Sequence, residues 1–268
     1  MPQTRNQPIP PELAFAGGLA DLVGPIALQH FRTPLRVDRK GDDSPVTVAD
    51  RLIEATLRAR IVEAYPDHGI FGEEEAPLNP DSAAVWVVDP IDGTKSFVTG
   101  HPLFGSLIAL LRGGRPVLGQ IDMPALGERW QGMAGQASTF NGRPCRTSGC
   151  TSLAEAHAYT TDPNQFRGRA AAAHGALAES ARLLRYGGDC YSYGLLASGH
   201  CDLVLETGLQ PYDYLPLVQI VEGAGGAISD WSGAPLTLAS SGEVLASATP
   251  ELHDAMLARL AALAPLPA

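Results

Sequence analysis

Basic residues are scarce in this sequence. Its 268 residues include 19 Lys and Arg against 29 Asp and Glu, which leaves a formal net charge of −10 at pH 7. Proteins that bind nucleic acids or anionic membranes without specificity carry an excess of positive charge. We therefore expect neither kind of partner. An anionic small molecule would need positive charge from another source, such as a metal ion.

Cysteines and long apolar runs are scarce as well. The four cysteines form no CxxC pair and have no His at zinc-site spacing, which is typical of reduced thiols in the cytoplasm. No apolar run approaches the ~20 residues that span a bilayer. The N-terminus lacks the charged start and apolar run of a signal peptide, so we expect a cytoplasmic protein.

Glycine and proline, by contrast, are abundant, with 29 and 22 residues, and 45% of the chain is apolar. This composition favours a mixed α/β protein with many turns and a sizeable core. Apolar periodicity predicts helices at 12–31, 47–65, 164–180, 190–198, 212–223 and 250–262. It predicts strands at 85–88, 104–111, 116–121, 128–133, 157–160, 182–186 and 202–206. We expect one domain, 1–268, with two fused lobes at about 11–140 and 141–268.

Two acidic residues follow one apolar strand. The strand ends at Asp89, and Asp92 comes three residues later in the motif Asp-Pro-Ile-Asp-Gly-Thr at 89–94. Carboxylates are the ligands that Mg²⁺ prefers. Gly93 lets the backbone approach a ligand, and Thr94 could begin a helix whose N–H groups point at phosphate. An ordinary Asp-Gly turn has the same residues, so this motif alone leaves both interpretations open.

Other acidic residues are ambiguous when each is taken alone. The Gly-Glu-Glu-Glu segment at 72–75 looks like a solvated surface, although the apolar pair before it would let Glu73 face inward. Asp213 stands near the start of an apolar helix, where the ordinary role of an aspartate is capping. No Ser-His-Asp or Cys-His arrangement with a supporting motif occurs, which disfavours a covalent nucleophile.

The order and spacing of these motifs resemble the inositol monophosphatase-like family of metal-dependent phosphatases. The resemblance is carried by Gly-Glu-Glu at 72–74, the motif at 89–94, and Asp213 ahead of a helix that ends in Gly-Ala-Gly-Gly at 223–226. One departure is Tyr212, where many relatives carry Trp. The resemblance implies alternating helix and sheet layers (αβαβα), as in inositol monophosphatase and fructose-1,6-bisphosphatase. It also implies Mg²⁺-dependent hydrolysis of a small phosphate monoester, commonly by a homodimer.

The resemblance further implies a set of metal ligands. Glu73, Asp89 and the backbone carbonyl of Ile91 would hold one Mg²⁺. Asp89, Asp92 and Asp213 would hold a second, with two or three Mg²⁺ ions in each active site. Both sites share Asp89, so this residue is expected to be central to the cluster.

The same resemblance implies how water and phosphate are handled. Glu73 and Thr94 would orient a metal-activated water for attack. The N–H groups of Gly93 and Thr94 would hold the phosphate. Lys40 and Asp50 match a mobile loop that closes near the metals.

Further stretches, at 95–110, 185–191 and 203–213, resemble the histidinol-phosphate phosphatase branch of the family. Histidinol phosphate carries an ammonium group and an imidazole, so its pocket should offer hydrogen-bond acceptors. Asp189 and Glu206 are candidates because a carboxylate beside an ammonium makes a charge-assisted hydrogen bond. Capping for Asp189 and surface exposure for Glu206 are the ordinary alternatives. Arg185 either approaches the substrate or pairs with a neighbouring carboxylate.

Three other functions stay open at this point. The runner-up substrate is inositol-1-phosphate, and another is 3′-phosphoadenosine 5′-phosphate, whose phosphatases often share a lysine at the position of Lys95. A non-catalytic relative would be expected to lose a ligand carboxylate, and this sequence retains all four.

Overall fold

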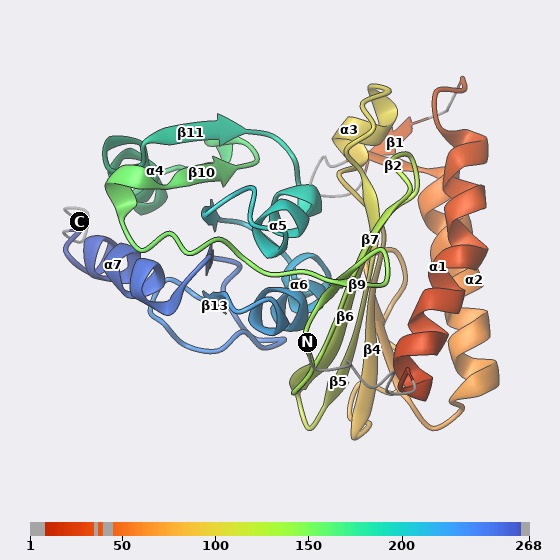
Figure 1. Cartoon of the computed structure of the whole chain (residues 1–268). Coiled ribbons are helices and arrows are strands. Elements are labelled where there is room, and N and C mark those ends of the chain that lie inside the picture. The colour runs from red at the N-terminus through yellow and green to blue at the C-terminus, as the bar shows by residue number, and fades with distance from the viewer. Residues whose placement is uncertain (1–8, 35–36, 40–44, 264–268) are drawn as a thin grey trace.

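The computed structural model describes residues 9–34, 37–39 and 45–263, and in this part of the chain helices and sheets alternate in five layers (Figure 1). Two sheets separate three layers of helices, so the expected αβαβα architecture is confirmed. The outer layer on one side contains α1 (Pro11–His30) and α2 (Val48–Ala64). The middle layer contains α5 (Cys190–Ala197) and α6 (Pro211–Gly223), and the opposite outer layer contains α4 (Arg169–Ser180) and α7 (Pro250–Ala261).

The larger sheet has seven strands in sequence order, β3-β4-β5-β6-β7-β8-β9. These are Gly69–Gly72, Ala84–Asp92, Gly105–Arg112, Arg115–Met123, Glu128–Met133, Thr139–Phe140 and Arg143–Pro144. Successive side chains of a strand point to opposite faces. In β4, Val85 and Val87 therefore face the core around α5 and α6, whereas Trp86 and Val88 face the core under α1 and α2. Helices on both faces explain why the first five residues of β4, Ala84–Val88, are all apolar.

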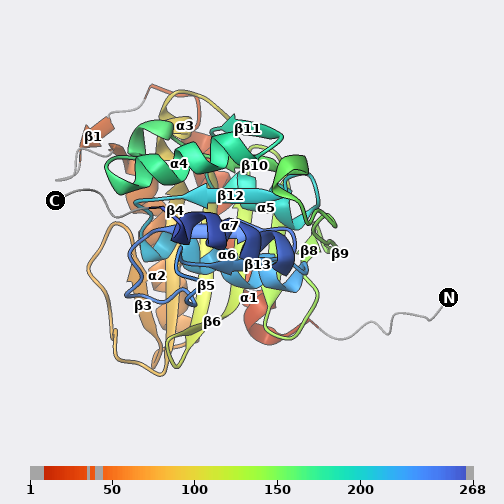
Figure 2. The same ribbon diagram turned by 90° about the vertical axis from the view of Figure 1, so that its left-hand side faces the viewer.

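The smaller sheet has five strands in the order β11-β10-β12-β14-β13. Their bounds are Leu183–Tyr186, His157–Thr160, Leu203–Glu206, Val244–Ser247 and Ala227–Ser229. Strands β11, β10 and β12 run parallel, so their carboxyl ends meet at one edge of the sheet. Figure 2 looks onto the outer layer of this half, with α4 and α7 in front of the sheet.

Helix α6 belongs to the second half of the chain but packs on the first sheet. Two glycines allow this close approach. A Cβ atom at Gly119 of β6 would lie 2.9 Å from the carbonyl carbon of Pro216, and one at Gly132 of β7 would lie 2.5 Å from the backbone nitrogen of Ile220. Both distances are shorter than any normal Cβ contact, so only glycine admits α6 at this depth. The two sheets thereby share a core that α6 helps to fill.

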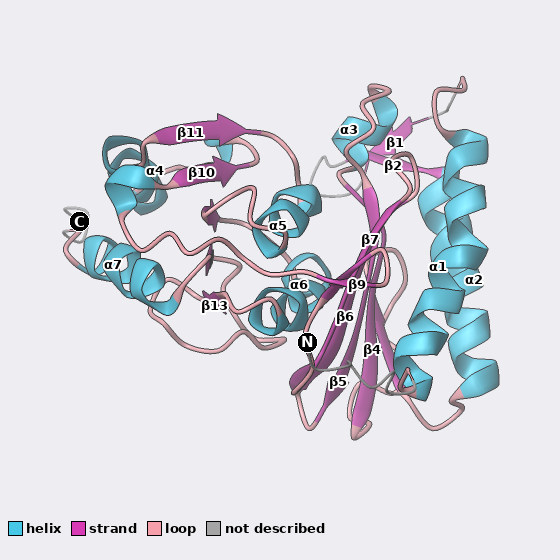
Figure 3. Ribbon diagram, in the orientation of Figure 1, coloured by secondary structure: helices cyan, strands magenta, loops and turns pink. Residues whose placement is uncertain are grey.

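Several boundaries differ from the expected ones. The segment at 164–180 is a short 3₁₀ turn, Pro163–Gln165, followed by α4, and Gly168 separates the two with a φ of 58°. The hairpin of β1 (Val37–Arg39) and β2 (Pro45–Thr47) was not predicted. Figure 3 shows these elements by type.

The helix α1 is long and apolar enough to pass as a membrane span by length and composition, contrary to the expectation from the sequence. This is weak evidence for a span, because core helices of soluble proteins pass the same test. Here α1 contacts α2 and strands β5 and β6 of the larger sheet, and it buries Leu19, Val23 and Ala27 there.

Candidate active site

A bulge in β4 brings Asp89 and Asp92 together. In a regular strand, residues three apart point to opposite faces. Here Asp89 pairs with Leu107 and Asp92 with Gly105, so three steps on β4 match two on β5. An extra residue of this kind bends a strand and redirects its side chains. Pro90, which lies in the bulge, has no N–H to donate to a ladder.

Asp213 joins this pair from the opposite side. Carboxylate oxygens of Asp89, Asp92 and Asp213 all lie within 4.8 Å of one another. Asp213 is also a helix cap, because its Oδ2 accepts a hydrogen bond of 2.7 Å from the backbone N–H of Gln210 at the start of α6. The Asp213 side chain can therefore cap α6 and belong to the carboxylate cluster at the same time. On the other side, Asp92 accepts a hydrogen bond of 2.7 Å from the backbone N–H of Cys190.

Glu73 follows β3, which runs parallel to β4, and lies beside Asp89, although it does not belong to the group of three acids whose oxygens lie within 4.8 Å of one another. Its carboxylate is close enough to Asp89 to contribute both a charge and a hydrogen bond to the environment of Asp89. Phe71, two residues earlier, packs against the Tyr212 ring with centroids 6.3 Å apart. Tyr212 thus supports the end of β3 beside the first turn of α6, as expected for an aromatic residue before Asp213.

The four acidic residues repel one another in the absence of a cation. Burial, followed by the charges of Glu73, Asp92 and Asp213, raises the pKa of Asp89 well above its ordinary value. Burial and the charge of Asp213 raise the pKa of Asp92 to about 7, and burial raises the pKa of Asp213 to about 7. Among the described residues, Oδ1 of Asp89 is buried without a hydrogen-bond partner. An unpartnered oxygen within a set of carboxylates fits a hard divalent cation such as Mg²⁺.

The turn after Asp92 leads directly into a short helix. Gly93 has a φ of 80°, a conformation that disfavours other residues, and α3 (Thr94–Val98) begins at the next position. The Thr94 hydroxyl donates a hydrogen bond of 3.0 Å to the Ile91 carbonyl. Phe97 is buried and anchors the helix in the core. Gly93 and Thr94 line a cavity of about 390 Å³ together with Glu73, Asp92 and Asp213.

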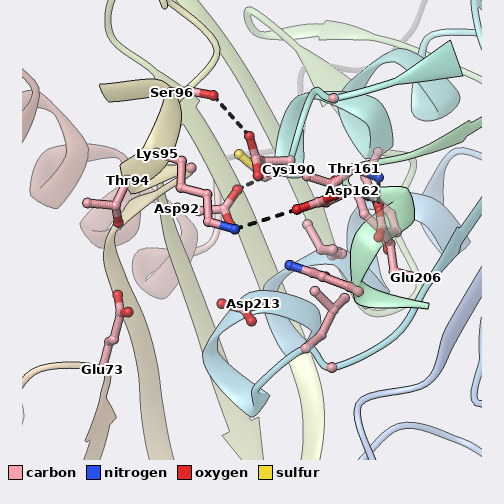
Figure 4. Close-up of a pocket in the computed structure, with 18 residues that line it drawn as sticks. Glu73, Asp92, Thr94, Lys95, Ser96, Thr161, Asp162, Cys190, Glu206 and Asp213 are labelled. Carbon is pink, nitrogen blue, oxygen red and sulfur yellow. Dashed lines mark hydrogen bonds and ion pairs between the residues drawn. The ribbon is translucent and has the colours of Figure 1, made fainter. Parts of the chain in front are cut away.

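The far wall of this cavity comes from the second sheet and carries another buried carboxylate (Figure 4). Glu206, at the end of β12, is 1% exposed, so it is not a surface residue. It accepts hydrogen bonds of 2.7 Å from both the backbone N–H and the hydroxyl of Thr161. Burial raises the pKa of Glu206 to about 8, against the lowering effect of the Thr161 hydrogen bonds.

Asp189 lies between the two walls of the cavity. Its Oδ2 accepts a hydrogen bond of 3.2 Å from the Ser96 hydroxyl and lies 3.1 Å from where a Cβ atom of Gly93 would be. It stands at the N-cap position of α5, but its side chain makes no capping hydrogen bond. Burial and the charge of Asp92 raise the pKa of Asp189 to about 7.

Two other predicted residues lie elsewhere, and a third falls outside the described part of the chain. Arg185 is exposed on β11 and lines a neighbouring cavity, which shares Lys95 and Ser96 with the first. Asp50 is buried at the start of α2, where its Oδ2 accepts a hydrogen bond of 2.9 Å from the backbone N–H of Thr47. Lys40 lies outside the described residues.

The structure also shows contacts around the cavity that sequence reasoning missed. Thr161 holds Glu206, Ser96 holds Asp189, and Lys95 lies 3.7 Å from Asp162 across the cavity. The threonine could have been found had the pairing of β10 with β12 been known, because the carboxyl ends of neighbouring parallel strands lie side by side. Ser96 and Lys95 lie in the stretch at 95–110 that resembles the histidinol-phosphate phosphatase branch, but nothing in the sequence predicted their contacts with Asp189 and Asp162.

Comparison with known proteins decides the family. The model of the inositol monophosphatase family matches residues 11–264. The chain belongs to this family. It is therefore a phosphatase of a group whose members are metal-dependent and act on small phosphate esters.

Individual relatives differ in their described substrates. The chain is 44% identical to "Bifunctional phosphatase IMPL2, chloroplastic" of Arabidopsis thaliana, over 92% of this chain and 74% of the relative. It is 37% identical to a "Histidinol-phosphatase" of Chlorobaculum parvum, over 88% and 92%. A solved structure, described as an inositol monophosphatase from Zymomonas mobilis, superimposes with a TM-score of 0.86 at 44% identity and covers 93% of this chain and 97% of that chain. The substrate therefore has to be argued from the pocket.

Proposed function

We propose that this protein hydrolyses L-histidinol phosphate to L-histidinol and phosphate, with Mg²⁺ as cofactor, in histidine biosynthesis. One observation carries the choice of substrate. Besides proposed metal ligands, the cavity is lined by the carboxyl groups of Asp189, Glu206 and Asp162, of which Asp162 lies 3.7 Å from Lys95. An anionic phosphate ester alone gives no reason for Asp189 and Glu206, whereas a substrate that also carries an ammonium group does.

The position of Asp189 supports this reasoning. In histidinol phosphate the ammonium is attached to the carbon next to the ester CH₂, so it lies close to the phosphate. Asp189 approaches Gly93, in the turn proposed to hold the phosphate. Glu206 lies deeper, where the imidazole or the ammonium could donate a hydrogen bond to it. The histidinol-phosphatase of Chlorobaculum parvum, 37% identical, adds support of a separate kind.

For the reaction, we propose that Glu73, Asp89, the carbonyl of Ile91, Asp92 and Asp213 hold two or three Mg²⁺ ions. When bound, such ions neutralise phosphate oxygens and make water more acidic. The protein's own groups then have distinct tasks. Thr94 and Glu73 orient the attacking water, and Glu73 accepts its proton. As the bond between phosphorus and the water oxygen forms, the bond between phosphorus and the ester oxygen breaks, and the ester oxygen takes up a proton to leave as the hydroxyl of histidinol. The N–H groups of Gly93 and Thr94 hold the phosphate in line with that water.

Other parts of the proposal concern the whole molecule. We propose one catalytic domain with fused lobes at about 11–140 and 141–268, because the cavity is lined from both. We also propose a cytoplasmic homodimer. Asp50 lies in the first turn of α2, so it is not part of the expected mobile loop, and a place for Lys40 near the metals stays a prediction. Sedimentation velocity would measure the oligomeric state. Arg185 lies outside the cavity, and a role for it in substrate binding stays a prediction.

Inositol-1-phosphate is the second candidate, because the 44% identical structure from Zymomonas mobilis is described as an inositol monophosphatase. Measuring kcat/KM for histidinol phosphate, inositol-1-phosphate and 3′-phosphoadenosine 5′-phosphate tests the choice. We expect histidinol phosphate to be preferred. A preference of about tenfold for either alternative, equivalent to ~1.4 kcal/mol, would overturn the substrate proposal.

The metal site has its own test. Asp89→Asn should abolish Mg²⁺-dependent phosphate release while the circular-dichroism spectrum stays that of the wild type. Full activity in this variant would contradict the proposed ligands.

A further inference from the structure

The loop that carries Glu73 is held by one buried carboxylate from α2. Glu54 is 0% exposed. Its Oε2 accepts a hydrogen bond of 2.7 Å from the backbone N–H of Glu74, and its Oε1 accepts one of 3.0 Å from the backbone N–H of Glu75. These two N–H groups belong to the residues directly after Glu73, between β3 and β4.

Arg58 and Gly72 also contact the Glu54 carboxylate beside this loop. Nε of Arg58 donates a hydrogen bond of 2.8 Å to Oε1 of Glu54, and its Nη2 donates one of 2.8 Å to the Glu75 carbonyl. On the other side of Glu73, a Cβ atom at Gly72 would lie 2.6 Å from the Glu54 carboxyl carbon. The Glu54 carboxylate therefore lies against the backbone at Gly72, before Glu73, and accepts hydrogen bonds from the backbone after Glu73.

We propose that Glu54 is a positioning residue, which aims the Glu73 carboxylate at Asp89 and thereby sets the metal affinity of the site. A buried carboxylate is unfavourable unless it is paired and hydrogen-bonded, and here its partners are Arg58 and the loop itself. Groups that orient a metal ligand typically change metal affinity or activity by about 10- to 100-fold when they are replaced. The inference rests on the role proposed for Glu73.

Glu54→Gln is the informative variant because it keeps the size of the side chain. The amide has one acceptor oxygen, and its NH₂ group would face a loop N–H donor, so one hydrogen bond to the loop is lost. We expect the fold to be retained, Mg²⁺ affinity measured by calorimetry on the substrate-free protein to fall about tenfold, and kcat to fall with it. KM at saturating Mg²⁺ should stay unchanged. Glu63→Gln, an exposed acid on the same helix paired with Arg60, is the matched control and should match the wild type.

Two further variants make the result decisive. Gly72→Ala pushes the intact Glu54 carboxylate away from the loop, so it should weaken Mg²⁺ binding in the same way even if Glu54→Gln does not fold. Glu73→Gln gives the reference loss of the ligand itself. Wild-type Mg²⁺ affinity and kcat in Glu73→Gln would refute the proposed role of Glu73. The positioning role of Glu54 would be overturned by a different pair of results. In that case Glu73→Gln is defective, whereas Glu54→Gln has lower stability but keeps wild-type Mg²⁺ affinity and kcat.

Discussion

Replacing Glu206 by Gln offers the sharpest test of how the pocket recognises its substrate. Gln keeps an acceptor oxygen for the Thr161 N–H and hydroxyl, which lie 2.7 Å from Oε1 of Glu206, but it cannot carry a negative charge. A hydrogen bond to a charged group is worth about 1.5–3 kcal/mol. We therefore expect kcat/KM for histidinol phosphate to fall by about 10- to 100-fold, and kcat/KM for the uncharged ring of inositol-1-phosphate to fall much less.

The pH dependence of this effect follows from the pKa of Glu206, which burial raises from 4.5 to about 8. The ammonium needs the ionised carboxylate, so kcat/KM of the wild type should gain from rising pH as Glu206 loses its proton. The variant lacks this gain. We divide the kcat/KM of the wild type by that of Glu206→Gln at each pH, with the same substrate. Any pH dependence that comes from titration of the substrate cancels in this ratio. We expect the ratio to widen from about pH 5.5 to about pH 9.

The stability of the metal-free protein provides an independent measurement. A carboxyl group with a raised pKa contributes stability that is fully present below its unfolded pKa and is lost as pH rises through its folded pKa. For Glu206 this window runs from pH 4.5 to about 8, and the loss is on the order of 5 kcal/mol. Urea unfolding should thus show a flatter pH dependence in Glu206→Gln. Wild-type kcat/KM for histidinol phosphate at every pH, with an unchanged stability profile, would refute this reasoning.

Three further predictions can be checked with the same methods. Asp189→Asn keeps an acceptor for Ser96 but should lower kcat/KM for histidinol phosphate about tenfold, and an equal loss with inositol-1-phosphate would argue against contact with the ammonium. Gly119→Ala should lower the free energy of unfolding in urea by about 1–3 kcal/mol because its Cβ meets α6, whereas Gly18→Ala, with nothing within 4 Å, serves as the control. Mg²⁺ should raise Tm more at about pH 8 than at about pH 6, because protons compete for acids whose pKa is about 7, and equal shifts would contradict this.

Much of the fold could be predicted because its signals are local. The strand at 85–88 and the helices at 12–31 and 250–262 follow from apolar periodicity and from the prolines that bound them, and the structure confirms them to within a few residues. The break at Gly168 was missed because the alanine-rich segment after it has strong helical propensity, which hides the irregular backbone before it.

The site could be predicted only in part, for a related reason. Asp89 and Asp92 stand in one short motif, but the bulge that turns them to the same side is a property of strand pairing and leaves no clear pattern. The partners of Glu206 and Asp189 lie 45 and 93 residues away in the chain. The role of Glu54 is harder still to predict from the sequence. It lies on a helix, 20 residues before its hydrogen-bond donor Glu74, and in the sequence it looks like an ordinary surface acid.

The carboxylate cluster can form only when the two halves of the chain are assembled. Asp213 reaches Asp89 and Asp92 because α6 packs on β6 and β7, and that packing depends on the absence of side chains at Gly119 and Gly132. The cap that Asp213 makes at the start of α6 is local to that helix end, so the docking of α6 carries the Asp213 carboxylate with it. Mutual repulsion among the acids opposes this assembly, and a bound cation would relieve it. We therefore predict that Mg²⁺ binding and the docking of α6 are coupled, and that a substitution that loosens α6 weakens Mg²⁺ binding even though it touches no proposed ligand.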